Sequence, residues 1–308
     1  MKKYFNYIAL PALALGLVAC EPEFENEIED GTVYTNGEAN FSSYVAVGNS
    51  LTAGFADGAL YITGQENSYP NIMAQQFALA GGGEFTQPLV NDNLGGLTLG
   101  GTQITNNRFV LATDENGNPG PALLTGTPTT DITNVVTGPF NNVGVPGAKS
   151  FHLVAPGYGN VAGVPTGQAN PYFARFASEA NATVMGDALA ANPSFFSLWI
   201  GNNDILSFAT SGGAGVDQTG NFDPTTYGSN DITDPNVFAN VYSQEVSLLV
   251  ASGAQGALVN IPDVTSIPFF TTVPSQAIPL DATTAATLNA AFAAYNTQVL
   301  PGLASFGI

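Results

Sequence analysis

The stretch Ser43-Tyr44-Val45-Ala46-Val47-Gly48-Asn49-Ser50 decides the fold. Its first five residues favour β-structure and predict a short strand, which stops at the turn Gly48-Asn49-Ser50. Pro70 then fits the first turn of a helix that continues to about Ala80. The local order is therefore strand, turn and helix, with Ser50 in the turn.

Later segments repeat this order. Residues 194–200 form a second apolar run, which ends in Gly201-Asn202-Asn203-Asp204, and residues 256–261 form a third. Helical spacing of apolar residues recurs at 173–189, after Asp234-Pro235 and after Asp281. Strands that alternate with helices predict an α/β fold with a mostly parallel sheet, in which polar turns collect at the carboxyl ends of the strands.

Two Gly-rich segments interrupt the alternation. Residues 82–135 are rich in Gly, Thr and Asn and read as an insertion, with a β-hairpin that turns at Asn116-Gly117. Residues 212–234 predict an exposed loop. Both would shape the surroundings of a site at the sheet edge.

The charge balance limits the possible partners. The 308 residues hold 5 Lys and Arg against 24 Asp and Glu, a formal net charge of −19. Lys2 and Lys3 lie at the N-terminus, so only Arg108, Lys149 and Arg175 remain for a folded domain. So few cations cannot neutralise a run of phosphates, and we expect no nucleic-acid partner.

The N-terminus is typical of an export signal. A basic start and a short apolar run lead to Leu17-Val18-Ala19-Cys20, which resembles a bacterial lipobox. The resemblance implies a signal peptide over 1–20, a lipid on Cys20 and a location in the bacterial cell envelope, anchored to the outer membrane. The alternative is a buried thiol. The acidic stretch directly after Cys20 resembles that of some lipoproteins displayed on the outer face, which implies exposure at the surface, with a periplasmic position as the alternative. The acidic run after Cys20 predicts a tether over 21–40, and a single cysteine allows no internal disulfide.

Ser50 carries the candidate chemistry. A serine in a tight turn between a strand and a helix presents its hydroxyl at the sheet edge, with backbone N–H groups beside it. The alternative is a loop turn in which the hydroxyl only caps a helix. Asn203-Asp204 has the same two interpretations, a functional turn or a helix N-cap.

Three blocks together resemble the SGNH or GDSL hydrolases. Gly48-Asn49-Ser50-Leu51-Thr52 is similar to their nucleophile block, residues 142–148 (Asn-Val-Gly-Val-Pro-Gly-Ala) to their glycine block, and Gly201-Asn202-Asn203-Asp204 to their Gly-x-Asn-Asp block. The resemblance implies a three-layer, flavodoxin-like sandwich over 41–308. It also implies that Ser50 is the nucleophile, with the Ser50 and Gly147 backbone N–H groups and the Asn203 amide as the oxyanion hole. Asn49 departs from the family's Asp by an isosteric change.

The family's base is a histidine in a C-terminal Asp-x-x-His block, and no such block occurs among the 308 residues. The single histidine, His152, lies where the family has an early helix, so we interpret it as a half-buried or surface helix residue. Two explanations remain: the sequence stops before the block, together with a last strand and helix, or the protein is a degenerate relative that only binds. The first is preferred because the chain ends in apolar residues.

These observations leave two main hypotheses. One is an ester hydrolase acting on an acetylated glycan, a lipid or a small ester. The other is a non-catalytic lipoprotein that binds a glycan or lipid through the same cleft; an adhesin without a cleft is a weaker third. We expect no cofactor, no metal, a membrane contact through the lipid on Cys20, and a monomer.

Overall fold

The computed structural model describes residues 34–273 and 279–305 and divides the chain into two compact units, residues 1–261 and 262–308. The signal peptide, Cys20 and residues 21–33 of the tether lie outside the described residues. The candidate site residues all fall in the first unit.

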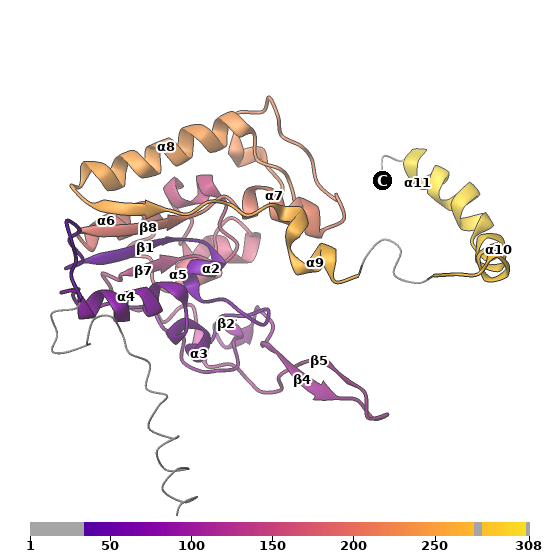
Figure 1. Cartoon of the computed structure of the whole chain (residues 1–308), viewed down its shortest axis with the longest axis horizontal. Helices are drawn as coiled ribbons and strands as arrows, with labels where there is room; N and C mark the ends of the chain where they lie inside the picture. Colours follow the sequence, from indigo (N-terminus) through magenta and orange to yellow (C-terminus); the bar gives the residue numbers. More distant parts are fainter. Residues whose placement is uncertain (1–33, 274–278, 306–308) are drawn as a thin grey trace, which may run out of the picture. The chain divides into compact units, whose positions relative to one another are not determined.

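The first unit is built on a four-stranded parallel sheet (Figure 1). Its order is β7 (Asn142–Gly144), β1 (Tyr44–Gly48), β8 (Phe195–Trp199) and β9 (Gln255–Leu258). β1 pairs with both neighbours, so that Gly48 lies opposite Gly144 on one side and Trp199 on the other. The expected α/β fold with a mostly parallel sheet is thus confirmed, and β1, β7 and β8 end side by side.

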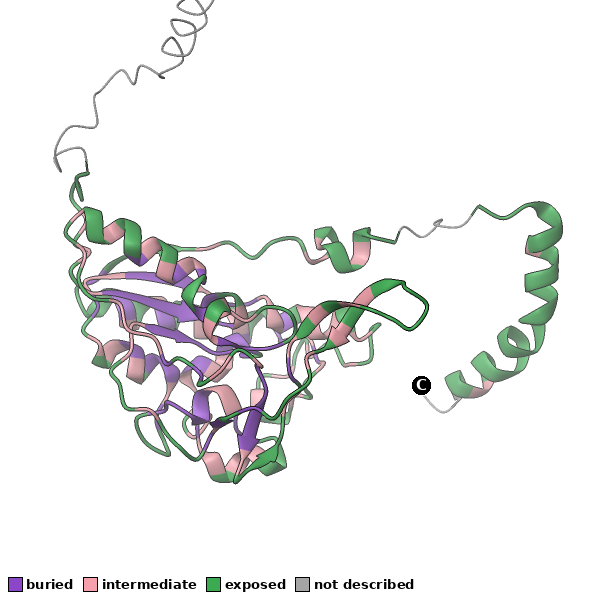
Figure 2. Cartoon of the chain, turned by 90° about the horizontal axis from the view of Figure 1, so that it is seen from below, coloured by how far each residue is buried: buried purple, intermediate pink, exposed green. Residues whose placement is uncertain are grey.

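Helices pack on both faces of β1 because its side chains alternate. Val45 and Val47 enter a large core cluster together with residues of β7, β8, α6 (Val184–Ala190) and α8 (Pro235–Ala251). Tyr44 and Ala46 enter a second cluster with α4 (Tyr69–Leu79). All five residues of β1 are buried, as Figure 2 shows for the centre of the sheet. The strand that precedes Ser50 is therefore held rigidly.

Capping residues set the ends of the helices as expected. Asp234 accepts hydrogen bonds from the N–H groups of Asn236 and Val237 at the start of α8, and Pro235 is its first residue. α4 includes Pro70 in its first turn and ends at Leu79, close to the expected Ala80. The short helices α2 (Ser50–Ala53) and α7 (Asn203–Thr210) follow β1 and β8 after one and three residues, respectively.

The insertion forms its own small sheets. β2 (Leu97–Leu99), β3 (Thr102–Gln103) and β6 (Thr130–Asp131) make one sheet, and β4 (Phe109–Thr113) pairs with β5 (Pro119–Leu123). The predicted hairpin is confirmed, with Gly117 at a φ of 84° in its turn. Figure 1 shows the hairpin projecting from the body.

Two predicted elements are wrong in extent. The helix predicted over 173–189 is two helices, α5 (Pro171–Ala174) and α6, because Asn170 and Thr183 each cap a separate start. The third strand ends at Leu258, three residues before the expected Ile261. The loop at 212–234 holds only the short turn η3 (Pro224–Thr226), and three of its last four residues, Asp231, Thr233 and Asp234, are buried.

The second unit is helical. Its elements are η4 (Val264–Ser266), α9 (Pro268–Thr271), α10 (Ala282–Ala291), the π-helix η5 (Tyr295–Val299) and α11 (Leu300–Ser305). Asp281 caps α10 through the N–H of Thr284, in agreement with the sequence pattern. 

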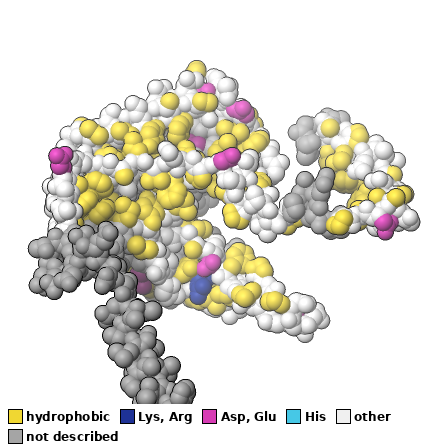
Figure 3. Space-filling model, in the orientation of Figure 1, with side chains coloured by type: hydrophobic (Ala, Val, Ile, Leu, Met, Phe, Trp, Pro, Cys, Tyr) yellow, Lys and Arg dark blue, Asp and Glu magenta, His cyan; other side chains and the backbone are white. Residues whose placement is uncertain are grey.

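Two of the three cations of the described residues are buried. Lys149 is 3% exposed and Arg175 is 2% exposed, so Arg108 is the one that reaches solvent among residues 34–273 and 279–305. Figure 3 shows one group of Lys and Arg atoms on the face drawn, beside hydrophobic side chains. Four acids, Asp204, Asp231, Asp234 and Glu245, are buried as well, so the surface of the described residues stays strongly acidic.

Candidate active site

Ser50 lies at the first position of α2, directly after β1. The helix is capped by Asn49, whose side chain accepts a hydrogen bond from the Leu51 N–H at 3.2 Å. The Ser50 hydroxyl makes no hydrogen bond within the described residues, and the side chain is half-buried. The capping role therefore belongs to Asn49, and the Ser50 hydroxyl is available for other chemistry.

Gly147 and Asn203 follow the two strands that flank β1. Gly147, at a φ of 80°, comes three residues after the end of β7, and Asn203 begins α7 after β8. The Asn203 side-chain amide donates to the Ala148 carbonyl at 2.9 Å instead of capping α7, so the N-cap interpretation of this side chain is wrong. An amide nitrogen has two hydrogens, which leaves one for a ligand.

Hydrogen bonds join the three loops. The Asn49 amide donates to the Asn202 side-chain oxygen at 3.3 Å, which links the turn after β1 to the turn after β8. The Val145 N–H donates to the Gly48 carbonyl at 3.0 Å, which links β1 to the loop after β7. The structure therefore brings the loops that carry Ser50, Gly147 and Asn203 to one edge of the sheet.

α2 also packs directly against β7. A Cβ atom added to Gly144 would lie 2.3 Å from the Ala53 nitrogen, so only glycine fits at this position. The Asn142 amide donates to the Thr52 carbonyl at 2.9 Å from the same strand. These contacts fix the direction of the helix that Ser50 begins.

Asp204 was expected only as part of the Gly-x-Asn-Asp block, and the structure gives it a clear role. Its carboxylate accepts from the Ser150 N–H at 2.9 Å and from the Ser150 hydroxyl at 2.7 Å. Burial raises the pKa of Asp204, while the two hydrogen bonds from Ser150 act in the opposite direction. The pair ties α7 to η1 (Ser150–Val154), the segment just after Gly147.

His152 lies in η1, and its ring already has hydrogen-bonding and stacking partners. Its Nδ1 accepts a hydrogen bond from the Lys149 N–H at 3.0 Å, and its ring stacks on Tyr158 with centroids 4.3 Å apart. Burial, and after it the charge of Lys149, lowers the pKa of His152 to about 4. This agrees with a half-buried helix residue, and no hydrogen bond joins His152 to Ser50 in the described structure.

Sequence reasoning missed Glu245, a fully buried acid near this network. Neither of its carboxyl oxygens has a hydrogen-bond partner among the described residues, and burial, followed by repulsion from Asp204, raises its pKa to about 9. It lies four residues after Val241 and four before Leu249, on the apolar stripe of α8. That spacing could have identified it as a buried acid.

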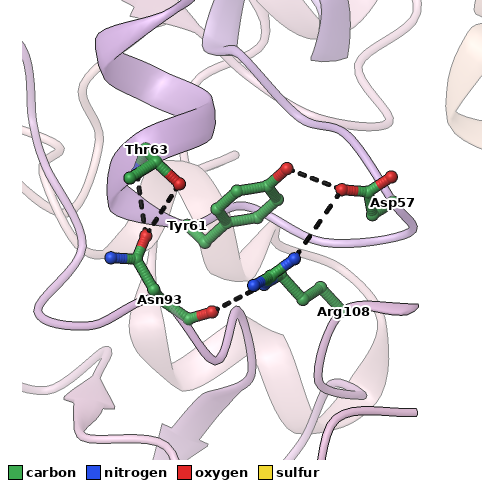
Figure 4. A network of polar contacts seen from close by, with 5 residues as sticks. All are labelled: Asp57, Tyr61, Thr63, Asn93 and Arg108. Atoms are coloured by element: carbon green, nitrogen blue, oxygen red, sulfur yellow. Dashed lines mark hydrogen bonds and ion pairs between the residues drawn. The ribbon is translucent and has the colours of Figure 1, made fainter. Parts of the chain in front are cut away.

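A second polar cluster joins the loop after α2 and the start of α3 (Ile62–Glu66) to the insertion (Figure 4). The Tyr61 hydroxyl donates to Asp57 at 2.7 Å, and the Arg108 guanidinium lies 4.0 Å from the same carboxylate and 4.8 Å from the centre of the Tyr61 ring. Arg108 also donates to the Asn93 carbonyl at 2.9 Å, while the Asn93 side chain accepts from Thr63. The cluster anchors the base of the hairpin to the loop that follows the candidate nucleophile.

Comparisons of the chain with family models, with curated proteins and with solved structures found no match. Among the described residues, no helix is both long and apolar enough to cross a membrane, and no group of three or more His, Cys, Asp and Glu side chains is arranged to hold a metal ion.

Proposed function

We propose that this protein is a serine ester hydrolase of the SGNH type, with a three-layer arrangement of helix, parallel sheet and helix. One observation carries the proposal: Ser50, Gly147 and Asn203 each follow one of three adjacent parallel strands, at the same edge of the sheet. The packing of helices against both faces of β1 supports the layered arrangement. Sites in such sheets form at the carboxyl ends of the strands.

The proposed reaction begins with the Ser50 hydroxyl. Its oxygen attacks the ester carbonyl while its proton passes to a base, which the single histidine does not supply because it makes no hydrogen bond with Ser50 in the described structure. The base returns the proton to the departing alcohol, the acyl group stays on Ser50, and water then releases the acid. The Ser50 and Gly147 N–H groups donate no hydrogen bond within the described residues, so both can bind the oxyanion together with the free Asn203 hydrogen. Losing one such donor costs about 3 kcal/mol in the transition state.

The test is hydrolysis of p-nitrophenyl acetate by a chain extended through an Asp-x-x-His block, because the 308 residues alone lack the base and should be nearly inert. We expect Ser50→Ala to abolish the enzymatic rate and Asn203→Ala to lower it about 100-fold. Ser229→Ala replaces an exposed serine and serves as the matched control, with an unchanged rate. Full activity in Ser50→Ala would exclude Ser50 as the nucleophile.

One observation favours a second candidate function, binding without catalysis. The chain has one histidine, and its Nδ1 is occupied by the Lys149 N–H. Loss of the histidine base in a serine protease costs about 10⁶ in kcat. If the proposal of binding holds, wild type and Ser50→Ala bind a small acetylated glycan with equal affinity by calorimetry, and neither releases acetate.

We propose further that Cys20 carries a lipid that holds the protein at the bacterial envelope. The lipobox-like Leu17-Val18-Ala19-Cys20 supports this assignment. In cells fed radiolabelled palmitate, the wild-type protein should be labelled and should sediment with membranes. Cys20→Ser should remove both properties, and persistent labelling of that variant would exclude Cys20 as the lipidated residue.

A further inference from the structure

A cavity of about 300 Å³ lies beside β7 and is separate from the candidate active site. It is lined by Val143 of the strand, by residues 135–140 that lead into it, and by Phe176 and Ala177. Residues 135–140 precede the amino end of β7, whereas Gly147 follows its carboxyl end. Neither Ser50, Gly147 nor Asn203 lines this cavity.

The wall of the cavity is mostly apolar, with one charged group. Val136, Phe140 and Phe176 supply apolar surface, and Asp187 of α6 is the acid among the lining residues. A volume near 300 Å³ is at the lower end of the range for small-molecule sites, which begins at about 300 Å³. The cavity therefore has the size and lining for a small organic molecule.

Asp187 keeps free acceptor positions. One carboxylate oxygen accepts from the Ser178 hydroxyl at 2.5 Å, and the other accepts from the Ser178 N–H at 3.1 Å. Each oxygen of a carboxylate can accept two hydrogen bonds, so each has one position left. The ion pair found among the described residues joins Arg108 to Asp57, and Asp187 has no cationic partner there.

We propose that this cavity binds a small amphiphilic amine, with its apolar body against Phe140 and Phe176 and its ammonium group on Asp187. The ammonium supplies both the hydrogen-bond donors and the positive charge that the carboxylate lacks. A carboxylate ligand of the same shape would be repelled by Asp187 and by a chain with a net charge of −19. This site is independent of the proposed hydrolase function.

The experiment titrates the protein with 4-phenylbutylamine by isothermal calorimetry at pH 7 and at low salt. The uncharged 4-phenylbutanol and the anionic 4-phenylbutyrate are the matched ligands. We expect the amine to bind with a ratio of one to one, the alcohol to bind about five-fold more weakly, and the carboxylate to give no heat. Equal binding of amine and alcohol would overturn the role of the carboxylate.

Variants locate the binding site. Asp187→Asn should weaken amine binding about five-fold and leave the alcohol unchanged. Glu179→Gln removes an exposed acid nearby that does not line the cavity, and it should bind the amine like wild type.

Ala190→Trp fills the cavity from an exposed position of α6, so it should abolish binding of both ligands without unfolding the chain. Ser50→Ala should bind the amine like wild type, which separates this test from the hydrolase test. Unchanged amine binding in a folded Ala190→Trp protein would overturn the proposed location.

Discussion

Asn49 shows how one side chain shapes the turn that carries Ser50. Its oxygen caps α2, and its amide nitrogen donates to the Asn202 oxygen across the sheet edge. The SGNH and GDSL hydrolases that the sequence resembles have Asp where this chain has Asn49, and a carboxylate could make the cap but not the second bond. The Asn49–Asn202 hydrogen bond therefore requires the amide of Asn49.

Asn49→Asp should therefore lower stability. The substitution replaces a donor with a second acceptor facing Asn202, at a residue that is 1% exposed, and the expected cost is about 1–3 kcal/mol. The thermal midpoint should fall by about 3–8 °C, measured by calorimetry. Asn106→Asp, at an exposed position, is the control and should leave the midpoint unchanged. An equal midpoint for Asn49→Asp would mean that the pair contributes nothing.

Glu245 makes stability depend on pH. Its pKa is about 9 in the folded protein and near 4.5 when exposed, so between these values unfolding releases a proton. The contribution of Glu245 to stability is therefore complete below pH 4.5 and is lost as the pH rises toward 9. Glu245→Gln removes this titration.

We expect Glu245→Gln to raise the free energy of unfolding at pH 8 by about 2–4 kcal/mol and to leave it unchanged at pH 4. Urea unfolding at the two pH values measures both. Glu66→Gln, at an exposed position, should show no difference at either pH. The same gain at pH 4 and pH 8 would rule out titration as the cause.

The site residues differ in how far the sequence predicts them. Ser50 and Asn203 each follow an apolar run directly, so their positions at strand ends follow from local pattern. The two hydrogen bonds that Ser150 donates to Asp204 join segments 54 residues apart, and a local sequence pattern carries no information about contacts between such distant segments. Sequence reasoning therefore found the candidate site but not the contacts that hold it.

Among the elements, the β4–β5 hairpin depends most on its turn. Asp114 accepts from the N–H groups of Asn116 and Asn118, and Gly117 takes a φ of 84°. Leu111 is 81% exposed, so the hairpin has little packing to support it beyond its own strand pairing. Local stability of this element should be low.

Gly117→Ala should open the hairpin without unfolding the body. A left-handed φ costs a residue with a Cβ atom about 1–2 kcal/mol, although the space around Gly117 is open. Hydrogen exchange should quicken about five- to thirty-fold at the amides of β4 and β5 only. Gly120→Ala, also in open space but without a positive φ, is the control. If the amides of β4 exchange at the same rate in Gly117→Ala as in the wild type, the expectation is wrong.

The predicted start of a helix was accurate where the sequence showed its capping residue. Asp234-Pro235 marks one start, and α8 begins there as predicted. Over 173–189 the Ala-rich composition hid a second start at Thr183, whose side chain accepts from the Gly186 N–H. Alanine favours helix wherever it occurs, so composition alone could not reveal the break between α5 and α6.

On the scale of the whole molecule, like charges repel one another with little compensation. The net charge is −19, and two of the three cations in the described residues are buried. Salt screens such repulsion, so raising NaCl from 0.05 to 0.5 M should raise the thermal midpoint by several degrees at pH 7. At a pH equal to the isoelectric point of about 4.1, where the net charge is close to zero, the same increase in salt should change the thermal midpoint little. An equal shift at both pH values would indicate a cause other than charge.

The order of strands in the main sheet has a consequence for biosynthesis. β1 needs β8 as its neighbour, yet Tyr44 and its partner Phe195 lie 151 positions apart in the sequence. A ribosome that adds about 5–20 residues per second needs on the order of 10–30 s to make that stretch. The β7 partner of β1 is made earlier, but until residues 195–199 have been added the other edge of the apolar strand Tyr44–Gly48 has no final partner, so this edge of the nascent polypeptide stays open to non-native pairing.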